Sequence, residues 1–220
     1  MNARAAEAAC GWANAVNSVN TLLILANVAA YALIAPYADA AVATFALWPI
    51  GTFVDPDTRI AVGFRPWQLV TSAFLHANLL HLLLNMIGLM SFGGQVERAL
   101  GSRRYLRLYF VAVLAAAVVQ LVVVSAAAGA QPYATVGASG GVFGVLLAFG
   151  TLFPRRMVML LFPPIPMPAW LLVVLFAVIE LTSGVFGTQA GIAHFAHLGG
   201  MLGAIVLLRR WRRIDRTRMW

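Results

Sequence analysis

The sequence predicts an all-α polytopic membrane protein, a bundle of six transmembrane helices, and three observations lead to this fold class. Hydrophobic residues make up 62% of the 220 residues, and the mean hydropathy is +0.87. A soluble domain of this size does not bury so much apolar surface. Apolar runs close to membrane-spanning length recur along the whole chain. Arginine residues cluster in every second loop between these apolar runs, which is typical of loops that lie on the same, cytoplasmic side of a membrane.

The apolar runs divide the chain into one membrane domain, 19–210, and two short ends. We expect the spans at 19–36, 73–95, 105–128, 139–154, 168–187 and 192–210. Residues 1–18 lack the charged-then-apolar order of a signal peptide, so a short cytoplasmic N-terminal segment is expected there. Residues 211–220 should form a basic cytoplasmic tail. The first loop, 37–66, is rich in aromatic residues and should lie in the membrane interface.

All 15 basic residues are arginine, and their placement predicts the orientation of the chain. Clusters follow the second, fourth and sixth spans, whereas the other loops hold only Arg59 and Arg65. The positive-inside tendency therefore places both termini in the cytoplasm. These clusters also account for the net charge of +8 through contact with the lipid bilayer, so no nucleic-acid partner is expected. The Lys-free, Ala- and Arg-rich composition is typical of a GC-rich bacterial genome, which favours the inner (plasma) membrane.

The fourth predicted span is too short to cross the bilayer. It runs from Ser139 to Phe153, which is about 22 Å of helix against a hydrocarbon core of about 30 Å. Ser139 therefore begins a partly submerged helix, below the outer surface of the membrane. The segment before it, 129–137, must enter the protein as irregular backbone, which is tolerated only where protein buries it or water reaches it.

Glycine spacing predicts which residue Ser139 meets. In the sixth span His197, Gly200 and Ala204 share one helix face, and Gly199 and Gly203 form a small-residue pair beside it. The fourth span carries a matching set of small residues, Gly137, Gly140, Gly141 and Gly144. If these faces pack together, His197 reaches Ser139 and can act as its base. The alternative is that both glycine sets serve only close packing and His197 is a satisfied polar contact.

The second span offers hydrogen-bond donors for an oxyanion. His81 and Asn85 lie one helical turn apart and share a face. The backbone N–H of Ser139, at a helix start, would be a third donor. The alternative is that His81 and Asn85 only join neighbouring helices, as such residues often do in membranes.

A third triad member would be a carboxylate, and only two acids lie near spans. Glu97 is on the cytoplasmic side, at the wrong depth, and nothing in the sequence orients Glu180 of the fifth span towards His197. We therefore expect a Ser139–His197 dyad without an acid, in which Phe143, one turn after Ser139, stacks on the imidazole.

These residues resemble the motifs of the rhomboid intramembrane serine proteases. "GASG" corresponds to the nucleophile segment, "AHLGG" to the base segment, "HANLLHLLLN" to the oxyanion donors, and "GGQVERALG" to the end of the second span, where Glu97 and Arg98 look structural. The resemblance covers about 19–210 and implies a six-helix bundle with a water-filled cavity open to the outer side. Phe143 stands where many relatives have Tyr, and Gln68 follows Trp67 where their first loop often has Arg.

The function expected from these residues is that of a serine endopeptidase without a cofactor, which cleaves transmembrane protein substrates in or near the membrane. His194, three residues before the base, is expected to support it, as are Gly137 and Gly140. A catalytically silent rhomboid-like protein that binds or escorts membrane clients is the first alternative. A metal-dependent protease or transporter is the second. It is disfavoured because no His-Glu-x-x-His motif occurs and the sequence places no carboxylate beside His194 and His197.

Overall fold

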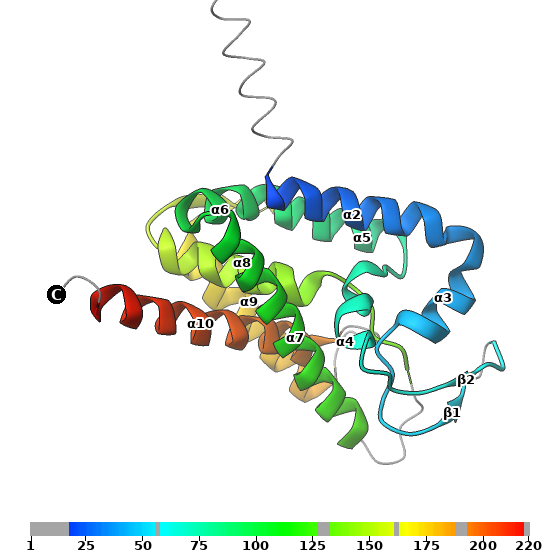
Figure 1. Ribbon diagram of the computed structural model, residues 1–220. Helices are drawn as coiled ribbons and strands as arrows, with labels where there is room; N and C mark the ends of the chain where they lie inside the picture. The colour runs from blue at the N-terminus through cyan, green and yellow to red at the C-terminus, as the bar shows by residue number, and fades with distance from the viewer. Residues whose placement is uncertain (1–17, 56–57, 127–132, 161–162, 188–192, 218–220) are drawn as a thin grey trace, which may run out of the picture.

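The computed structural model describes residues 18–55, 58–126, 133–160, 163–187 and 193–217, which form a helical bundle (Figure 1). The α-helices are α2 (Val19–Ile34), α3 (Ala38–Phe45), α4 (Gln68–Thr71), α5 (Leu79–Gly88), α6 (Gly94–Leu100), α7 (Ser102–Ala126), α8 (Ser139–Leu152), α9 (Ala169–Phe186) and α10 (His194–Thr217). The shorter turns are η1 (Ala35–Tyr37), η2 (Ser72–Phe74) and η3 (Leu89–Gly93), the last one a turn of π-helix that joins α5 to α6.

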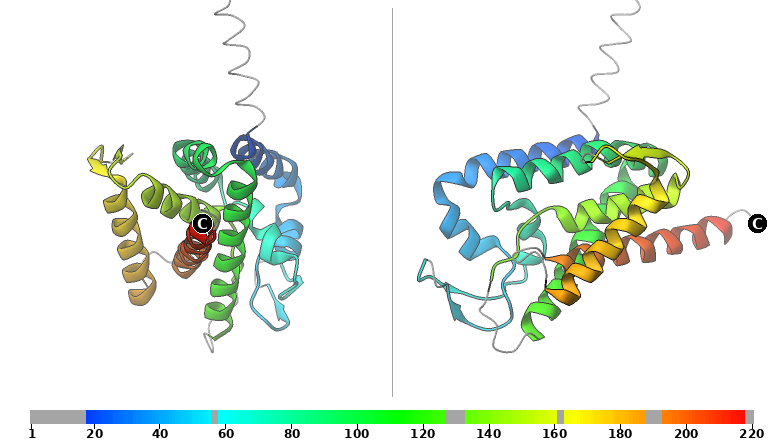
Figure 2. Two further views of the ribbon diagram at one scale, coloured as in Figure 1. Left: turned by 60° about the vertical axis from the view of Figure 1, so that its left-hand side comes forward. Right: turned by 180° about the vertical axis from the view of Figure 1, so that it is seen from behind.

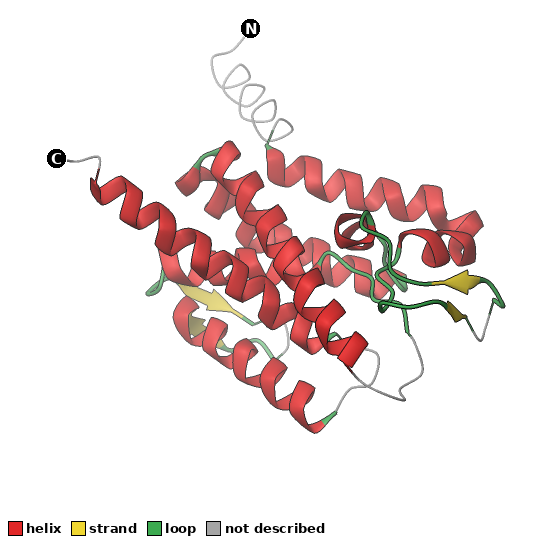
Figure 3. Ribbon diagram, turned by 60° about the horizontal axis from the view of Figure 1, so that its bottom comes forward, coloured by secondary structure: helices red, strands yellow, loops and turns green. Residues whose placement is uncertain are grey.

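Two small antiparallel ribbons complete the described chain. Strands β1 (Phe53–Val54) and β2 (Ala61–Val62) pair in the first loop, and β3 (Met157–Met159) pairs with β4 (Pro166–Pro168) between α8 and α9. Figure 3 shows the β1–β2 ribbon at the edge of the helices. Most of the N-terminal segment predicted at 1–18 and the last three residues of the tail lie outside the described residues.

The helices confirm an all-α polytopic membrane protein. Four helical stretches are long and apolar enough to cross a bilayer: Val19–Phe45, Leu79–Leu100, Ser102–Ala126 and Ala169–Phe186. The fourth predicted span corresponds to the shorter apolar helix α8, and the sixth corresponds to α10 from His194 onward. Large apolar side chains are exposed along α2, α5 and α9, as a lipid-facing surface requires.

Two predicted spans, the second and the sixth, differ from the observed helices by five or more residues at an end. The second span was expected from residue 73, but its helix begins at Leu79, because the Asn78 side chain accepts the backbone N–H of His81 at 2.8 Å and caps it. The sixth was expected to end at residue 210, but α10 continues to Thr217. Its last turns are tied to α7 by a bidentate ion pair between Arg104 and Asp215, at 2.9 and 2.8 Å.

Helix α8 lies in the middle of the bundle, with α7, α9 and α10 around it (Figure 2). The backbone of Gly200 on α10 lies directly on that of Gly140 on α8, so a Cβ atom on Gly200 would collide with the Gly140 carbonyl oxygen. A Cβ on Gly144 would lie 3.2 Å from the Gly200 carbonyl oxygen. The predicted contact between the fourth and sixth spans is therefore present, and it depends on glycine at the point of closest approach.

The remaining glycines of these helices pack elsewhere than predicted. Gly199 and Gly203 face α7. A Cβ on Gly199 would lie 2.9 Å from the Ala115 carbonyl oxygen, and a Cβ on Gly203 would lie 2.6 Å from the Ala115 Cβ. Gly141 faces the Tyr109 ring of α7, and does not bring α10 close. Helix α7 is thus a third partner in the packing, because α10 presents small residues on two adjacent faces.

Gln68 organises the first loop. Its side chain is fully buried, and its amide oxygen accepts from the backbone N–H of Trp48 at 3.3 Å and of Arg65 at 3.0 Å. Its amide nitrogen donates to the carbonyl oxygens of Thr44 at 3.3 Å and Gly63 at 3.2 Å. One side chain therefore satisfies four backbone groups. Gln68 therefore makes four polar contacts with this loop, at the position where relatives were expected to carry Arg.

Glu97 has a structural position, as the resemblance implied. Its buried carboxylate accepts from the backbone N–H groups of Val19 at 2.9 Å and Asn20 at 3.0 Å, at the start of α2. The hydroxyl of Ser102 donates to it at 2.6 Å. A carboxylate at a helix N-terminus neutralises the positive end of the helix dipole, so Glu97 joins α2 to the α6–α7 corner.

Candidate active site

Ser139 and His197 lie in direct contact. Ser139 is the first residue of α8, and His197 is in the first turn of α10. The distance between Ser139 Oγ and His197 Nε2 is 2.7 Å, a hydrogen bond of ordinary length. The imidazole is buried and the serine is half-buried. The close approach of Gly140 and Gly200 brings the two residues together, although 58 positions separate them in the chain.

Phe143 holds the plane of the His197 ring. The two rings are stacked, with their centroids 4.3 Å apart and their planes within 4° of each other. Phe176 of α9 meets the Phe143 ring edge-on at 5.8 Å. Rotation of the imidazole out of this plane would break the stack, so the aromatic pair fixes its orientation.

Glu180 corrects the prediction that no acid accompanies His197. Its carboxylate comes from α9 and is buried, and Oε2 lies 2.9 Å from His197 Nδ1. The same oxygen lies 2.6 Å from His194 Nδ1. The contact between Glu180 and His194 has good hydrogen-bond geometry. His197 Nδ1 is close enough to Glu180 for a hydrogen bond, but its N–H does not point at the carboxylate oxygen. Sequence reasoning missed this because residue separation along the chain does not reveal which face of α9 meets α10.

The prediction that no carboxylate lies beside His194 and His197, which was used against a metal site, is wrong, because Glu180 lies beside both. The ligand atoms of Glu180, His194 and His197 all lie within 4.8 Å of one another. Two ligands of a tetrahedral zinc ion, each bonded at about 2.0–2.1 Å, are about 3.3 Å apart. Separations of 2.6 and 2.9 Å are shorter, and they fit protons shared between imidazole and carboxylate.

His81 lies beside the nucleophile with one nitrogen facing it. His81 Nδ1 accepts the backbone N–H of Ala77 at 3.5 Å, which assigns the ring proton to Nε2. A Cβ atom on Gly137 would lie 2.8 Å from His81 Nε2 and 3.6 Å from Ser139 Oγ. Gly137 also has φ = 128°, a conformation that other residues rarely adopt. Glycine at 137 therefore leaves open the space between a ring N–H and the serine.

Asn85 is buried one turn further along α5, and its amide is partly used. Its nitrogen donates to the carbonyl oxygen of His81 at 2.9 Å. An amide nitrogen carries two hydrogens, so a second donor remains. The His76 ring packs edge-on against the His81 ring, with centroids 5.1 Å apart.

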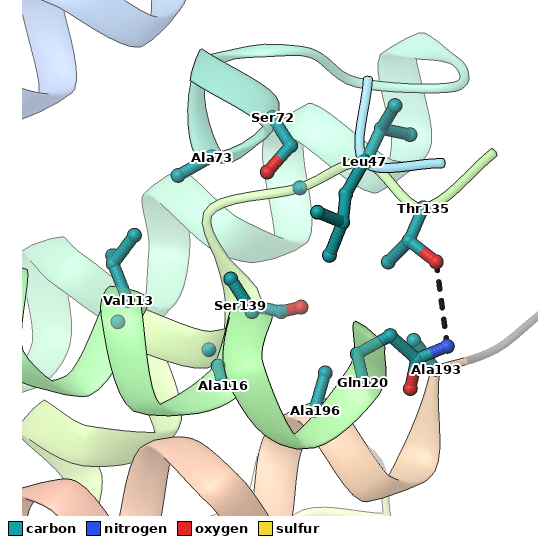
Figure 4. Close-up of a pocket in the computed structure, with 15 residues that line it drawn as sticks. Leu47, Ser72, Ala73, Val113, Ala116, Gln120, Thr135, Ser139, Ala193 and Ala196 are labelled. Carbon is teal, nitrogen blue, oxygen red and sulfur yellow. Dashed lines mark hydrogen bonds between the residues drawn. The ribbon is translucent and has the colours of Figure 1, made fainter. Parts of the chain in front are cut away.

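A cavity of about 30 Å³ opens at Ser139. Figure 4 shows the Ser139 side chain pointing into it, with Leu47, Ala116, Ala193 and Ala196 on the walls. Gln120 of α7 donates to the hydroxyl oxygens of Thr135 at 3.3 Å and Tyr133 at 3.1 Å on one side. Sequence reasoning missed Gln120, although an amide in the middle of an apolar span was an available signal.

The sequence also matches a known protein-family model over most of its length. The model of the Rhomboid domain matches residues 63–212. The chain belongs to the rhomboid family. This rhomboid is 32% identical over 162 residues to "Rhomboid protein 1, mitochondrial" of Saccharomyces cerevisiae, which covers 70% of this chain and 46% of the relative. It is 33% identical over 169 residues to "RHOMBOID-like protein 12, mitochondrial" of Arabidopsis thaliana, covering 70% of this chain and 48% of that one.

A further relative of this rhomboid is named a protease. It is "Rhomboid protease GluP" of Bacillus subtilis, 30% identical over 139 residues, which cover 62% of this chain and 24% of the relative. This rhomboid thus spans about half or less of the length of these curated relatives. The part matched by the Rhomboid domain, 63–212, includes all of α8, which carries Ser139, and the first turns of α10, which carry His197.

Proposed function

We propose that this rhomboid is an intramembrane serine endopeptidase that cleaves transmembrane protein substrates. The observation that carries the proposal is the 2.7 Å hydrogen bond between Ser139 Oγ and His197 Nε2 at the start of a short, central helix. Helix α8 has 14 residues, about 21 Å of rise, which is shorter than a hydrocarbon core about 30 Å thick, and this supports a serine that lies below the membrane surface.

The reaction follows from the positions of these atoms. Ser139 Oγ attacks the carbonyl carbon of a peptide bond, while His197 Nε2 takes the hydroxyl proton. As the tetrahedral intermediate collapses, the C–N bond breaks and the proton passes from His197 to the leaving amine. Water, activated in turn by His197, then hydrolyses the acyl-enzyme and restores the serine.

Three donors are proposed to hold the oxyanion. They are the backbone N–H of Ser139, at the positive end of α8, the Nε2–H of His81, and the second N–H of Asn85. All three come from groups on α5 or α8, two helices that are in contact. Loss of one such donor typically costs about 3 kcal/mol of transition-state stabilisation.

The cavity at Ser139 favours a small side chain next to the cleaved bond. Its walls approach closely at Ala116, Ala193 and Ala196, and its volume is about 30 Å³. A transmembrane helix must also unwind locally before attack, because its carbonyl groups are otherwise engaged in the helix. Substrates with small residues and helix breakers near the cleavage site therefore fit best.

The proposal places the chain in a bacterial inner membrane with both termini in the cytoplasm and the active site opening to the outer side. The orientation rests on the arginine clusters that follow alternate spans, and the bacterial membrane rests on the Lys-free, Ala- and Arg-rich composition. Cys10 is the single cysteine of the chain, so its labelling shows on which side of the membrane the N-terminal segment lies. A membrane-impermeant maleimide should label Cys10 only after the cells are opened. Labelling in intact cells would contradict this orientation.

The experiment that tests the proposal is co-expression of the rhomboid with a single-span substrate. Cleavage should occur with the wild type and disappear with Ser139→Ala and with His197→Ala. Purified wild type should react with a fluorophosphonate probe, whereas Ser139→Ala should not. A silent relative that escorts membrane clients, the second candidate, would bind the substrate equally well in all three forms and cleave it in none.

A further inference from the structure

One carboxylate oxygen joins the two histidines of α10. Glu180 Oε2 is 2.6 Å from His194 Nδ1 and 2.9 Å from His197 Nδ1. All three side chains are buried, with 7% of Glu180, 5% of His194 and 8% of His197 exposed. A buried carboxylate is costly unless it is paired, so this arrangement needs both imidazole donors to face it.

The packing of α9 on α10 holds this carboxylate in place. Gly184 lies one turn after Glu180, and a Cβ there would be 3.1 Å from the ring of Phe195 and 3.2 Å from His194 Cβ. The two helices therefore approach closely at the level of the first turn of α10, where both histidines lie. Glu180 reaches His197 from the side opposite to Ser139, because it meets Nδ1 while Ser139 meets Nε2.

The two ring nitrogens of His197 thus have different partners. Nε2 is the base for Ser139 only if it carries a lone pair, and the proton must then be on Nδ1. Among the described residues, Nδ1 has no hydrogen bond of good geometry, and the Glu180 carboxylate is the acceptor within ion-pair distance. Catalytic hydrogen bonds are often poorly aligned before substrate binds and tighten as charge develops.

We propose that Glu180 is a positioning residue for His197, so that Ser139, His197 and Glu180 act together as a triad in which the negative charge of Glu180 stabilises the positive charge on His197. This inference rests on the proposed protease function. The Glu180 carboxylate accepts a hydrogen bond from His197 Nδ1–H. It thereby selects the tautomer that leaves Nε2 free, and it stabilises the imidazolium that forms when Ser139 is deprotonated. Glu180 touches neither substrate nor serine, so it acts only through His197.

His194 holds the Glu180 carboxylate in position. Its Nδ1–H donates to the same oxygen as His197, at 2.6 Å, and so fixes the carboxylate in front of His197. The His194 ring is also edge-on to the His197 ring, at 6.5 Å and 87°. The hydrogen bond from His194 and the nearby His197 Nδ1 thus compensate the cost of burying the Glu180 carboxylate in an apolar helix.

The first test is a kinetic comparison of Glu180→Gln, Glu180→Asp and the wild type on a single-span substrate in detergent. Gln has the shape of Glu but no charge, so kcat should fall about 10²-fold while KM stays within about twofold. The loss should be smaller than the ~10⁴-fold effect of an altered triad aspartate, because Phe143 still orients the ring. Asp keeps the charge on a shorter side chain and should recover part of the rate.

A matched control separates positioning from helix packing. Thr182 lies on α9 near Glu180, is exposed, and donates only within its own helix, to Val178 at 2.8 Å and Ile179 at 3.1 Å. Thr182→Val should therefore leave kcat and KM unchanged. If Glu180→Gln melts at a lower temperature but each folded molecule keeps the wild-type kcat, Glu180 is only a helix-joining residue and the proposal is overturned.

The second test does not require cleavage. Nitrogen-15 NMR of histidine-labelled protein in the Ser139→Ala background reports the tautomer of His197. The proton should be on Nδ1 with Glu180 and should redistribute to Nε2 in Glu180→Gln. An unchanged tautomer overturns the proposal. Cleavage that survives Ser139→Ala would instead refute the protease proposal, so the two failures are distinguishable.

Discussion

The imidazole of His197 lies face to face on the ring of Phe143, with centroids 4.3 Å apart and planes within 4°. This contact joins α8 to α10 one turn beyond the serine, on the helix that carries it. The orientation of the base is therefore determined by a side chain of the nucleophile's own helix. The stacking side chain and the serine cannot move independently, because both belong to the first turns of α8.

Replacing the stacked ring should impair the reaction without unfolding the protein. We expect Phe143→Leu to lower kcat about tenfold, since an aromatic pair of this kind contributes about 0.5–1.5 kcal/mol beyond its buried area. Phe143→Tyr keeps the ring and should retain the wild-type rate. Cleavage of a single-span substrate by both variants checks this. Equal rates for Leu and Phe at 143 would show that the stack does not orient His197.

A methyl group at Gly200 should separate the nucleophile from the base. The Cβ of Gly200→Ala would collide with the carbonyl oxygen of Gly140, so α8 and α10 must move apart. We expect loss of cleavage and a fall in stability of about 2 kcal/mol, in the range of overpacking. Thermal unfolding and fluorophosphonate labelling measure the two effects.

Gly94→Ala is the matched control for this substitution. Gly94 also lies in a helix, but its Cβ would meet only the mobile end of the Arg98 side chain, at 3.5 Å. Because Ala is the better helix former, by up to about 1 kcal/mol, Gly94→Ala should be neutral or slightly stabilising. Similar losses in both variants would mean that glycine is needed for reasons other than the contact with Gly140.

The ring N–H of His81 should matter to the rate more than to binding. We expect His81→Phe to lower kcat about 10²- to 10³-fold with little change in KM, because an oxyanion donor acts in the transition state. His76→Phe replaces the ring packed edge-on against His81 and should have a smaller effect. A His81→Phe variant with wild-type kcat would remove His81 from the oxyanion site.

Gln68 should be essential for the structure of the first loop. Gln68→Ala leaves four backbone groups without their partner, and an unsatisfied buried group costs about 1–3 kcal/mol. Relaxation of the loop will reduce the sum, so we expect a loss of about 2–4 kcal/mol, seen as a lower melting temperature. Asp39→Asn, at an exposed site on α3, should leave the melting temperature unchanged. A Gln68→Ala variant as stable as the wild type would show that the loop is held by its apolar contacts.

Much of the candidate active site could be predicted from the spacing of residues along the chain. Ser139, His197 and Phe143 were assigned from small residues at helical intervals, and the structure brings all three together. Helical periodicity reveals such residues because one turn places positions three and four apart on the same face. The same logic misassigned Gly141 and Gly199, which face α7, since periodicity defines a face but not the neighbour that covers it.

The membrane class and the approximate positions of most helices follow from the sequence by itself, and so does the short length of the helix that begins at Ser139. Apolar runs, arginine clusters and helix length are local properties, and the bilayer imposes its thickness on each segment separately. Only the tertiary structure placed Glu180 between His194 and His197, and Gln68 at the centre of the first loop. Those contacts depend on the rotation of α9 about its axis and on the path of a loop, which are decided by packing between distant segments.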